Sequence, residues 1–136
     1  MIIALLDSKH ASHQRAHDWW QTEDNRSWAS CPLTQNGVLR IMSGSGYDSR
    51  RRFPIGDVFE QLSEFIENTR HEFWTAEISI LDDFLFNLDR IHGPKQLTYI
   101  YLLAMATGFK GQLVTFDQSI PISAVKNAKA ENLVVL

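Results

Sequence analysis

Segments with helical periodicity alternate with short apolar runs along the whole chain, and this alternation constrains the fold more than any other feature. The clearest helix follows Asp57, where apolar residues recur at helical spacing and acidic residues occupy the other side. The clearest strands are residues 113–116 and 133–136, which are continuous apolar runs typical of parallel sheets covered on both faces. The alternation predicts an α/β fold, with a parallel β-sheet flanked by α-helices.

The remaining segments continue the same pattern. Further strands are predicted at residues 28–31 and 71–74, and residues 43–56 are predicted to form a loop. Further helices are predicted at residues 12–20, from Thr34 to Met42, from Leu81 to Leu88 and from Thr98 to Gly108. Thr34 and Thr98 are residue types that cap helix N-termini, so each is predicted to begin its helix.

Length and composition indicate one soluble globular domain. The chain has 136 residues, of which 44% are apolar, and this is enough for a single core spanning residues 1–136. No apolar run approaches the about 18 residues that a membrane-spanning helix needs, so no membrane partner is expected. The single cysteine, Cys31, cannot form an internal disulfide, which predicts a cytoplasmic protein with Cys31 as a small buried hydrophobe.

The net charge of −3 argues against a globally basic nucleic-acid binder. Contact with RNA would therefore need a local basic patch. The densest one is Arg50, Arg51 and Arg52, which is either an RNA-binding patch or a solvated loop, and the solvated loop is favoured.

Functional groups in parallel α/β sheets gather at the carboxyl ends of the strands. Three places qualify here: the residues after Cys31, the start of the helix at Thr98, and Asp117 directly after the run 113–116. His13 and His17 share a helix face, but the zinc-protease motif with its glutamate is absent. Structural or surface histidines are therefore favoured over a metal site.

Five blocks follow one another along the chain: Ala4 to Trp19, Trp28 to Ser43 with its Thr34-Gln35-Asn36-Gly37, His71 to Asp82, Gln96 to Ala104, and Leu113 to Asp117. In this order and with this spacing they resemble one known family, the VapC-type PIN domains, over nearly the whole chain. The resemblance implies a PIN-like fold and endoribonuclease activity that depends on Mg²⁺ or Mn²⁺. In such a site several carboxylates hold hard cations, which activate water and stabilise charge on the phosphate. The family also implies a cognate antitoxin, an RNA substrate and a homodimer.

The acidic positions of the family are largely replaced in this chain. By the resemblance, the second acid falls on Gln35, the third on Tyr99, and only the fourth is kept, as Asp117. Aligning Ala4-Leu5-Leu6 with the family's first helix places the first aspartate, and the opening central strand, before Met1. The polar neighbours of the replaced and retained positions are Thr34, Asn36, Thr98 and Thr115. The implied site keeps one carboxylate, Asp117, as a weak metal ligand.

Several alternatives follow from these replacements. The favoured one is a toxin–antitoxin protein with weakened or lost nuclease activity, in which Asp117 and Gln35 could still hold one metal. The second is an inactive PIN module that binds antitoxin or RNA, and the third is an unrelated α/β domain. The missing opening strand predicts either another way of closing the sheet or a fragment, from a decayed gene or from a start codon set too far downstream.

Overall fold

The computed structural model describes residues 1–22, 26–48 and 53–136, which fall into two compact units, residues 1–76 and 77–136. The single domain over residues 1–136 stays a prediction. The first unit contains α1 (Ile2–Leu6), α2 (His13–Trp20), β1 (Ser27–Ser30), α3 (Pro32–Met42), α4 (Ile55–Glu67) and β2 (Arg70–Phe73). The second contains α5 (Leu97–Gly108), β3 (Leu113–Thr115), β4 (Leu133–Val135) and four 3₁₀ turns: η1 (Leu88–Arg90), η2 (Pro94–Gln96), η3 (Ile122–Ala124) and η4 (Ala130–Asn132).

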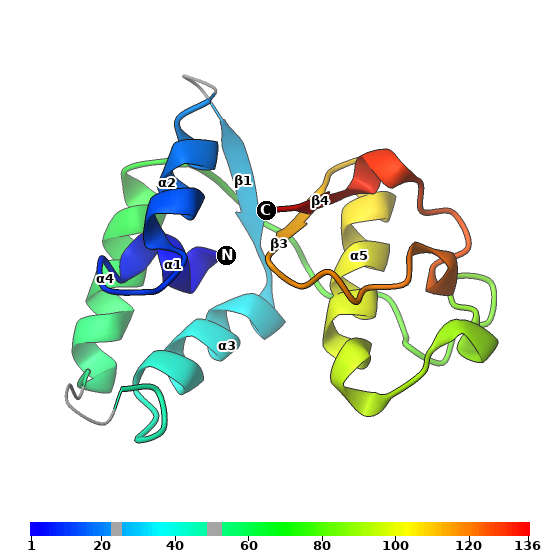
Figure 1. Cartoon of the computed structure of the whole chain (residues 1–136), viewed down its shortest axis with the longest axis horizontal. Coiled ribbons are helices and arrows are strands. Elements are labelled where there is room, and N and C mark those ends of the chain that lie inside the picture. The colour runs from blue at the N-terminus through cyan, green and yellow to red at the C-terminus, as the bar shows by residue number, and fades with distance from the viewer. Residues whose placement is uncertain (23–25, 49–52) are drawn as a thin grey trace. The chain divides into compact units, whose positions relative to one another are not determined.

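In the first unit, β1 and β2 form a parallel pair in which Trp28 lies opposite His71. Parallel neighbours need a crossover connection, and here α3 and α4 provide it. The carbonyl oxygen of Ser30 accepts a hydrogen bond from the N–H of Trp74 at 2.8 Å, which extends the ladder to the carboxyl ends of both strands. Helix α1 packs against both α3 and α4 (Figure 1).

The core of the first unit lies between helices. Its buried residues are Val38, Met42, Val58 and Leu62, from α3 and α4. The apolar spacing predicted after Asp57 accounts for this directly, because Val58 and Leu62 are the inward residues of α4. Three residues of α1 pack against the same cluster: Ile2, Ile3 and Leu6.

In the second unit, β3 and β4 form another parallel pair, with Leu113 opposite Leu133. Helix α5 packs against β3 (Figure 1). Its middle is buried or half-buried, from Ile100 to Ala106, as its apolar sequence predicts, whereas its first three residues are exposed. The buried residues of this core are Phe86, Ile100, Leu103, Ala104, Ile120, Ala124 and Val125.

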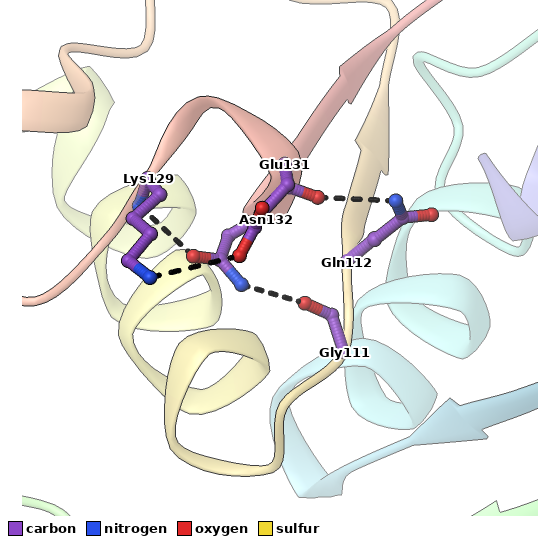
Figure 2. Close-up of polar contacts among 5 residues, drawn as sticks. All are labelled: Gly111, Gln112, Lys129, Glu131 and Asn132. Atoms are coloured by element: carbon purple, nitrogen blue, oxygen red, sulfur yellow. Dashed lines mark hydrogen bonds and ion pairs between the residues drawn. The ribbon is translucent and has the colours of Figure 1, made fainter.

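A small polar cluster fixes the amino ends of β3 and β4 (Figure 2). The side chain of Asn132 accepts a hydrogen bond from the backbone N–H of Lys129 at 2.9 Å and donates one to the carbonyl of Gly111 at 3.0 Å. Gln112 donates from its side chain to the carbonyl of Glu131 at 3.0 Å. These bonds join the turn before β4 to the residues before β3, so they help to set the register of the pair.

The prediction of parallel strands flanked by helices is confirmed, with the strands in two separate pairs among the described residues. The predicted helix from Leu81 to Leu88 is wrong. The carbonyl of Leu85 accepts from the N–H of Lys126, and the N–H of Asn87 donates to the carbonyl of Ala124. This bridge uses backbone groups that a helix would need, and it buries Phe86 while Leu81 stays 85% exposed.

Both predicted helix caps are also wrong. Helix α3 begins two residues before Thr34, at Pro32, because proline is favoured in the first turn and Cys31 precedes it as the N-cap. Helix α5 begins at Leu97, where it continues the 3₁₀ turn η2, so Thr98 lies inside the first turn. Cys31 is buried, as predicted.

Candidate functional site

Asp117 lies just after β3, where the chain turns away from the sheet. Its Oδ1 accepts hydrogen bonds from the hydroxyl of Ser119 at 2.6 Å and from the backbone N–H of Ser119 at 2.8 Å. The side-chain bond, followed by the backbone bond, lowers the pKa of Asp117 below its ordinary value. Asp117 is therefore a well-oriented, ionised carboxylate at neutral pH.

The start of α5 is tied to this turn. Gln96, the residue before the helix, donates from Nε2 to the carbonyl oxygen of Ser119 at 2.9 Å. Thr115, which is buried, accepts a hydrogen bond from the backbone N–H of Asp117 at 3.0 Å. The second unit thus brings together two of the three places predicted from the sequence, namely the end of β3 and the start of α5.

Thr98 and Tyr99 lie in the first turn of α5, and both are exposed. Within the part of the chain that the structure describes, neither side chain forms a hydrogen bond with Asp117. Thr98 and Tyr99 follow Gln96, whose side chain is bonded to the carbonyl of Ser119, but their assigned site roles remain predictions.

Gln35 belongs to the first unit, in the first turn of α3. Its Nε2 donates a hydrogen bond to the hydroxyl oxygen of Ser30 at 2.9 Å. The same hydroxyl lies 2.7 Å from Nε2 of His71, on the neighbouring strand. Ser30 is only 2% exposed, and burial lowers the pKa of His71, against an opposing effect of the Glu72 carboxylate. The position that the resemblance assigns to the second acid is therefore part of a Gln35–Ser30–His71 chain at the carboxyl end of β1.

The neighbours of Gln35 differ in their surroundings. The hydroxyl oxygen of Thr34 accepts from the backbone N–H of Cys31 at 2.8 Å and lies 3.0 Å from the Cys31 carbonyl, so it fixes the start of α3. Asn36 is exposed. Arg50, Arg51 and Arg52 lie outside the described residues, and their role as an RNA patch stays a prediction.

The donor set at the predicted positions does not fit a tightly held Mg²⁺ or Mn²⁺. Hard divalent cations take several oxygen ligands, usually with more than one carboxylate, whereas these positions supply one carboxylate, one amide and one phenol. Among the described residues, no group of three or more histidine, cysteine, aspartate or glutamate side chains is placed to hold a metal ion.

The helical histidines are used by the fold. Nδ1 of His13 lies 2.8 Å from the carbonyl oxygen of Ala4, and Nε2 of His17 lies 3.1 Å from that of Leu5. A carbonyl oxygen can only accept, so both rings donate to the end of α1, where helical carbonyls lack partners. The interpretation of these histidines as structural is confirmed.

Sequence reasoning missed four supporting residues: Ser30, His71, Gln96 and Ser119. Ser119 could have been found, because an Asp followed two residues later by a backbone donor is the usual pattern of an Asx turn. Ser30 and His71 are separated by 41 residues, and only the pairing of β1 with β2 places them on one face of the sheet. Nothing in a single sequence signals that pairing.

No helix in the described ranges is sufficiently long and apolar to cross a bilayer. No family model matches the chain. It is 40% identical over 136 residues to Ribonuclease VapC44 of Mycobacterium tuberculosis, and this alignment covers 100% of the chain and 94% of the relative. Ribonuclease VapC39 of the same species is 27% identical over 124 residues, covering 91% and 88%. Ribonuclease VapC29 is 29% identical over 120 residues, covering 88% and 83%. A relative of 40% identity that spans the whole chain shows that this protein belongs to the VapC family of PIN-domain proteins.

Proposed function

We propose that this chain is the VapC-type protein of a toxin–antitoxin system, in which metal-dependent endoribonuclease activity is weakened or lost. The relatives VapC44 and VapC39 carry the name ribonuclease, which supports RNA as the substrate class. The weakening of nuclease activity is inferred from two replacements at the family's acidic positions, Gln35 and Tyr99. Asp117 is the acidic position that keeps its carboxylate.

Charge explains why these replacements matter. Compared with a site of four carboxylates, the replacements at positions 35 and 99 remove two negative charges, so the attraction for a divalent cation falls by about half. The amide of Gln35 is neutral, and its nitrogen is already bonded to Ser30. The phenol of Tyr99 is also neutral near pH 7 and is a poor ligand for magnesium.

The same residues still suit binding. The carboxylate of Asp117, the amide of Gln35 and the exposed hydroxyls of Thr98 and Tyr99 can form hydrogen bonds with RNA. A cognate antitoxin, a second copy of the chain in a homodimer, and a cytoplasmic location complete the proposal. The antitoxin and the homodimer rest on the family. The cytoplasmic location rests on the family and on Cys31, the single cysteine, which is buried and free.

The test compares the original 136-residue protein with three variants: Gln35→Glu, Tyr99→Asp and the double variant. Calorimetric titration with Mg²⁺ or Mn²⁺ should show weak uptake by the original protein and progressively tighter uptake as acids are restored. RNA cleavage in the presence of metal should follow the same order. Stoichiometric, tight uptake and metal-dependent RNA scission by the original protein would overturn the proposal.

The alternative function is a PIN module that binds antitoxin or RNA without cleaving it. The bond from Gln35 Nε2 to the buried Ser30 favours this alternative, because it engages position 35 within the protein. RNA binding measured by gel shift in EDTA separates the two. The inactive module should bind equally well in EDTA and with Mg²⁺, whereas binding that needs a divalent ion would count against it.

A further inference from the structure

The hydroxyl of Ser30 is shared between two partners, and the chemistry of each fixes the direction of the hydrogen bonds. The Nε2 of Gln35 carries two hydrogens and cannot accept, so the Ser30 oxygen accepts from it at 2.9 Å. The single proton of Ser30 is then available to Nε2 of His71, 2.7 Å away. With His71 neutral, the chain of donation runs from Gln35 through Ser30 to His71.

The surroundings of His71 favour this direction. Burial lowers the pKa of His71. Its ring packs edge-on against the ring of Trp28 on the neighbouring strand, with 4.6 Å between the ring centroids. Glu72, on the same strand, is the charge that raises the pKa. Strand β1 contributes no titratable side chain. Helix α4 also packs on β2. Its acids do not contribute to the lowered pKa of His71; they are Asp57, Glu60, Glu64 and Glu67.

Protonation of His71 would reverse the chain. An imidazolium donates from both nitrogens, so its Nε2 would donate to Ser30, and the Ser30 proton would need another acceptor. The oxygen of the Gln35 amide can serve once the amide rotates by half a turn. In the neutral form, the same oxygen has no hydrogen-bond partner among the described residues and is available to a ligand.

We propose that Ser30 and His71 are positioning residues for Gln35, and that the proton on His71 decides whether Gln35 offers a ligand its amide oxygen or its amide nitrogen. The oxygen accepts from hydroxyl and amino groups, both of which RNA carries, whereas the nitrogen donates to acceptors such as phosphate oxygens. The ligand side of this inference rests on the proposed function. The hydrogen-bond chain does not depend on it.

The experiment follows the 136-residue protein, without RNA or metal, by ¹H–¹⁵N nuclear magnetic resonance as the pH is lowered. The side-chain amide signals of Gln35 should shift with the same midpoint as the ring of His71. In Ser30→Ala, His71 should still titrate while the Gln35 amide stays unmoved. Ser30→Thr, which keeps the hydroxyl, should restore the coupling, and the exposed Ser27→Ala in the same strand should leave it intact.

Gln35→Glu gives an independent readout. A carboxylate at position 35 can only accept hydrogen bonds, so the hydroxyl of Ser30 would donate to it. The Ser30 oxygen would then accept a hydrogen bond from His71. The His71 midpoint should rise by about one pH unit. The proposal would be overturned if the Gln35 amide signals did not shift as His71 titrates in the original protein. It would also be overturned if they still shifted with His71 in Ser30→Ala. Tight metal uptake with metal-dependent RNA scission by the original protein would instead refute the proposed function, and it would leave these spectra, recorded without RNA or metal, unchanged.

Discussion

Gln96 donates a hydrogen bond from Nε2 to the carbonyl oxygen of Ser119 at 2.9 Å, which ties the residue before α5 to the turn that orients Asp117. Ser119 in turn uses both its hydroxyl and its backbone N–H to hold Oδ1 of Asp117. The carboxylate is thus oriented by neighbours that lie 23 residues apart in sequence, so its placement depends on the packing of α5 beside β3.

Ser119→Ala should raise the pKa of Asp117 toward its ordinary value. The substitution removes the side-chain hydrogen bond, which is the largest cause of the lowered pKa, and keeps the backbone bond. Titration of the Asp117 carboxyl carbon by nuclear magnetic resonance measures the change. Ser123→Ala, at an exposed position in the same unit, is the matched control and should leave the pKa unmoved.

The sign of the accompanying pH effect follows from the direction of that shift. Because the pKa of Asp117 is lowered in the folded protein, its ionised form stabilises the fold above the ordinary aspartate pKa. That contribution is lost as the pH falls through the lowered value. Stability of the Ser119→Ala variant should therefore decline less on acidification than that of the original protein, and an equal or steeper decline would contradict this reasoning.

Asn132→Ala should destabilise the second unit by about 1–2 kcal/mol, because it removes one bond to Lys129 and one to Gly111 that fix the turn before β4 (Figure 2). Urea unfolding measures the loss. Lys129→Ala is the control, since it removes only an ion pair of 3.9 Å between side chains that are 75% and 74% exposed. Such pairs contribute little, and this variant should match the original protein to within about 0.5 kcal/mol.

The sequence predicted most elements because their signals are local. Helix α4 follows from its apolar spacing, and the strands of the second unit from their continuous apolar runs. The segment from Leu81 to Leu88 has the same spacing, yet it is not a helix. Its backbone pairs with residues near Val125, and Phe86, which lies off the apparent apolar face, is the residue buried at 2%. A distant partner overrode the local pattern there.

The candidate site divides in the same way. Asp117 could be predicted because it directly follows the apolar run 113–116, and Gln35 because it lies in the first turn of the helix after β1. The residues that orient them, Ser30 with His71 and Gln96 with Ser119, depend on contacts between segments that are remote in sequence. Local pattern therefore predicts which residues carry the chemistry, and tertiary structure decides how they are held.

His13→Ala should destabilise the first unit by about 1–2 kcal/mol, since it leaves the carbonyl of Ala4 at the end of α1 without its donor. A helix of five residues cannot sustain itself and depends on such contacts. Gln14→Ala, on the exposed face of α2, loses only a bond to Asp18 and should cost a few tenths of a kcal/mol. Equal losses in the two variants, measured by urea unfolding, would show that His13 does not support α1.

Phe86 and Phe84 offer the sharpest test of how residues 81–88 fold, because they are two residues apart and differ in exposure, 2% against 83%. Phe86→Ala would leave a cavity in the cluster around Ile100 and Leu103 and should cost about 3–5 kcal/mol. Phe84→Ala removes a ring already in water and should change the free energy of unfolding by less than about 0.5 kcal/mol. A helix with Leu81, Phe84, Leu85 and Leu88 inward predicts the opposite order. If Phe84→Ala proved the more damaging substitution in thermal or urea unfolding, the bridge to Val125 would be refuted and the helix reinstated.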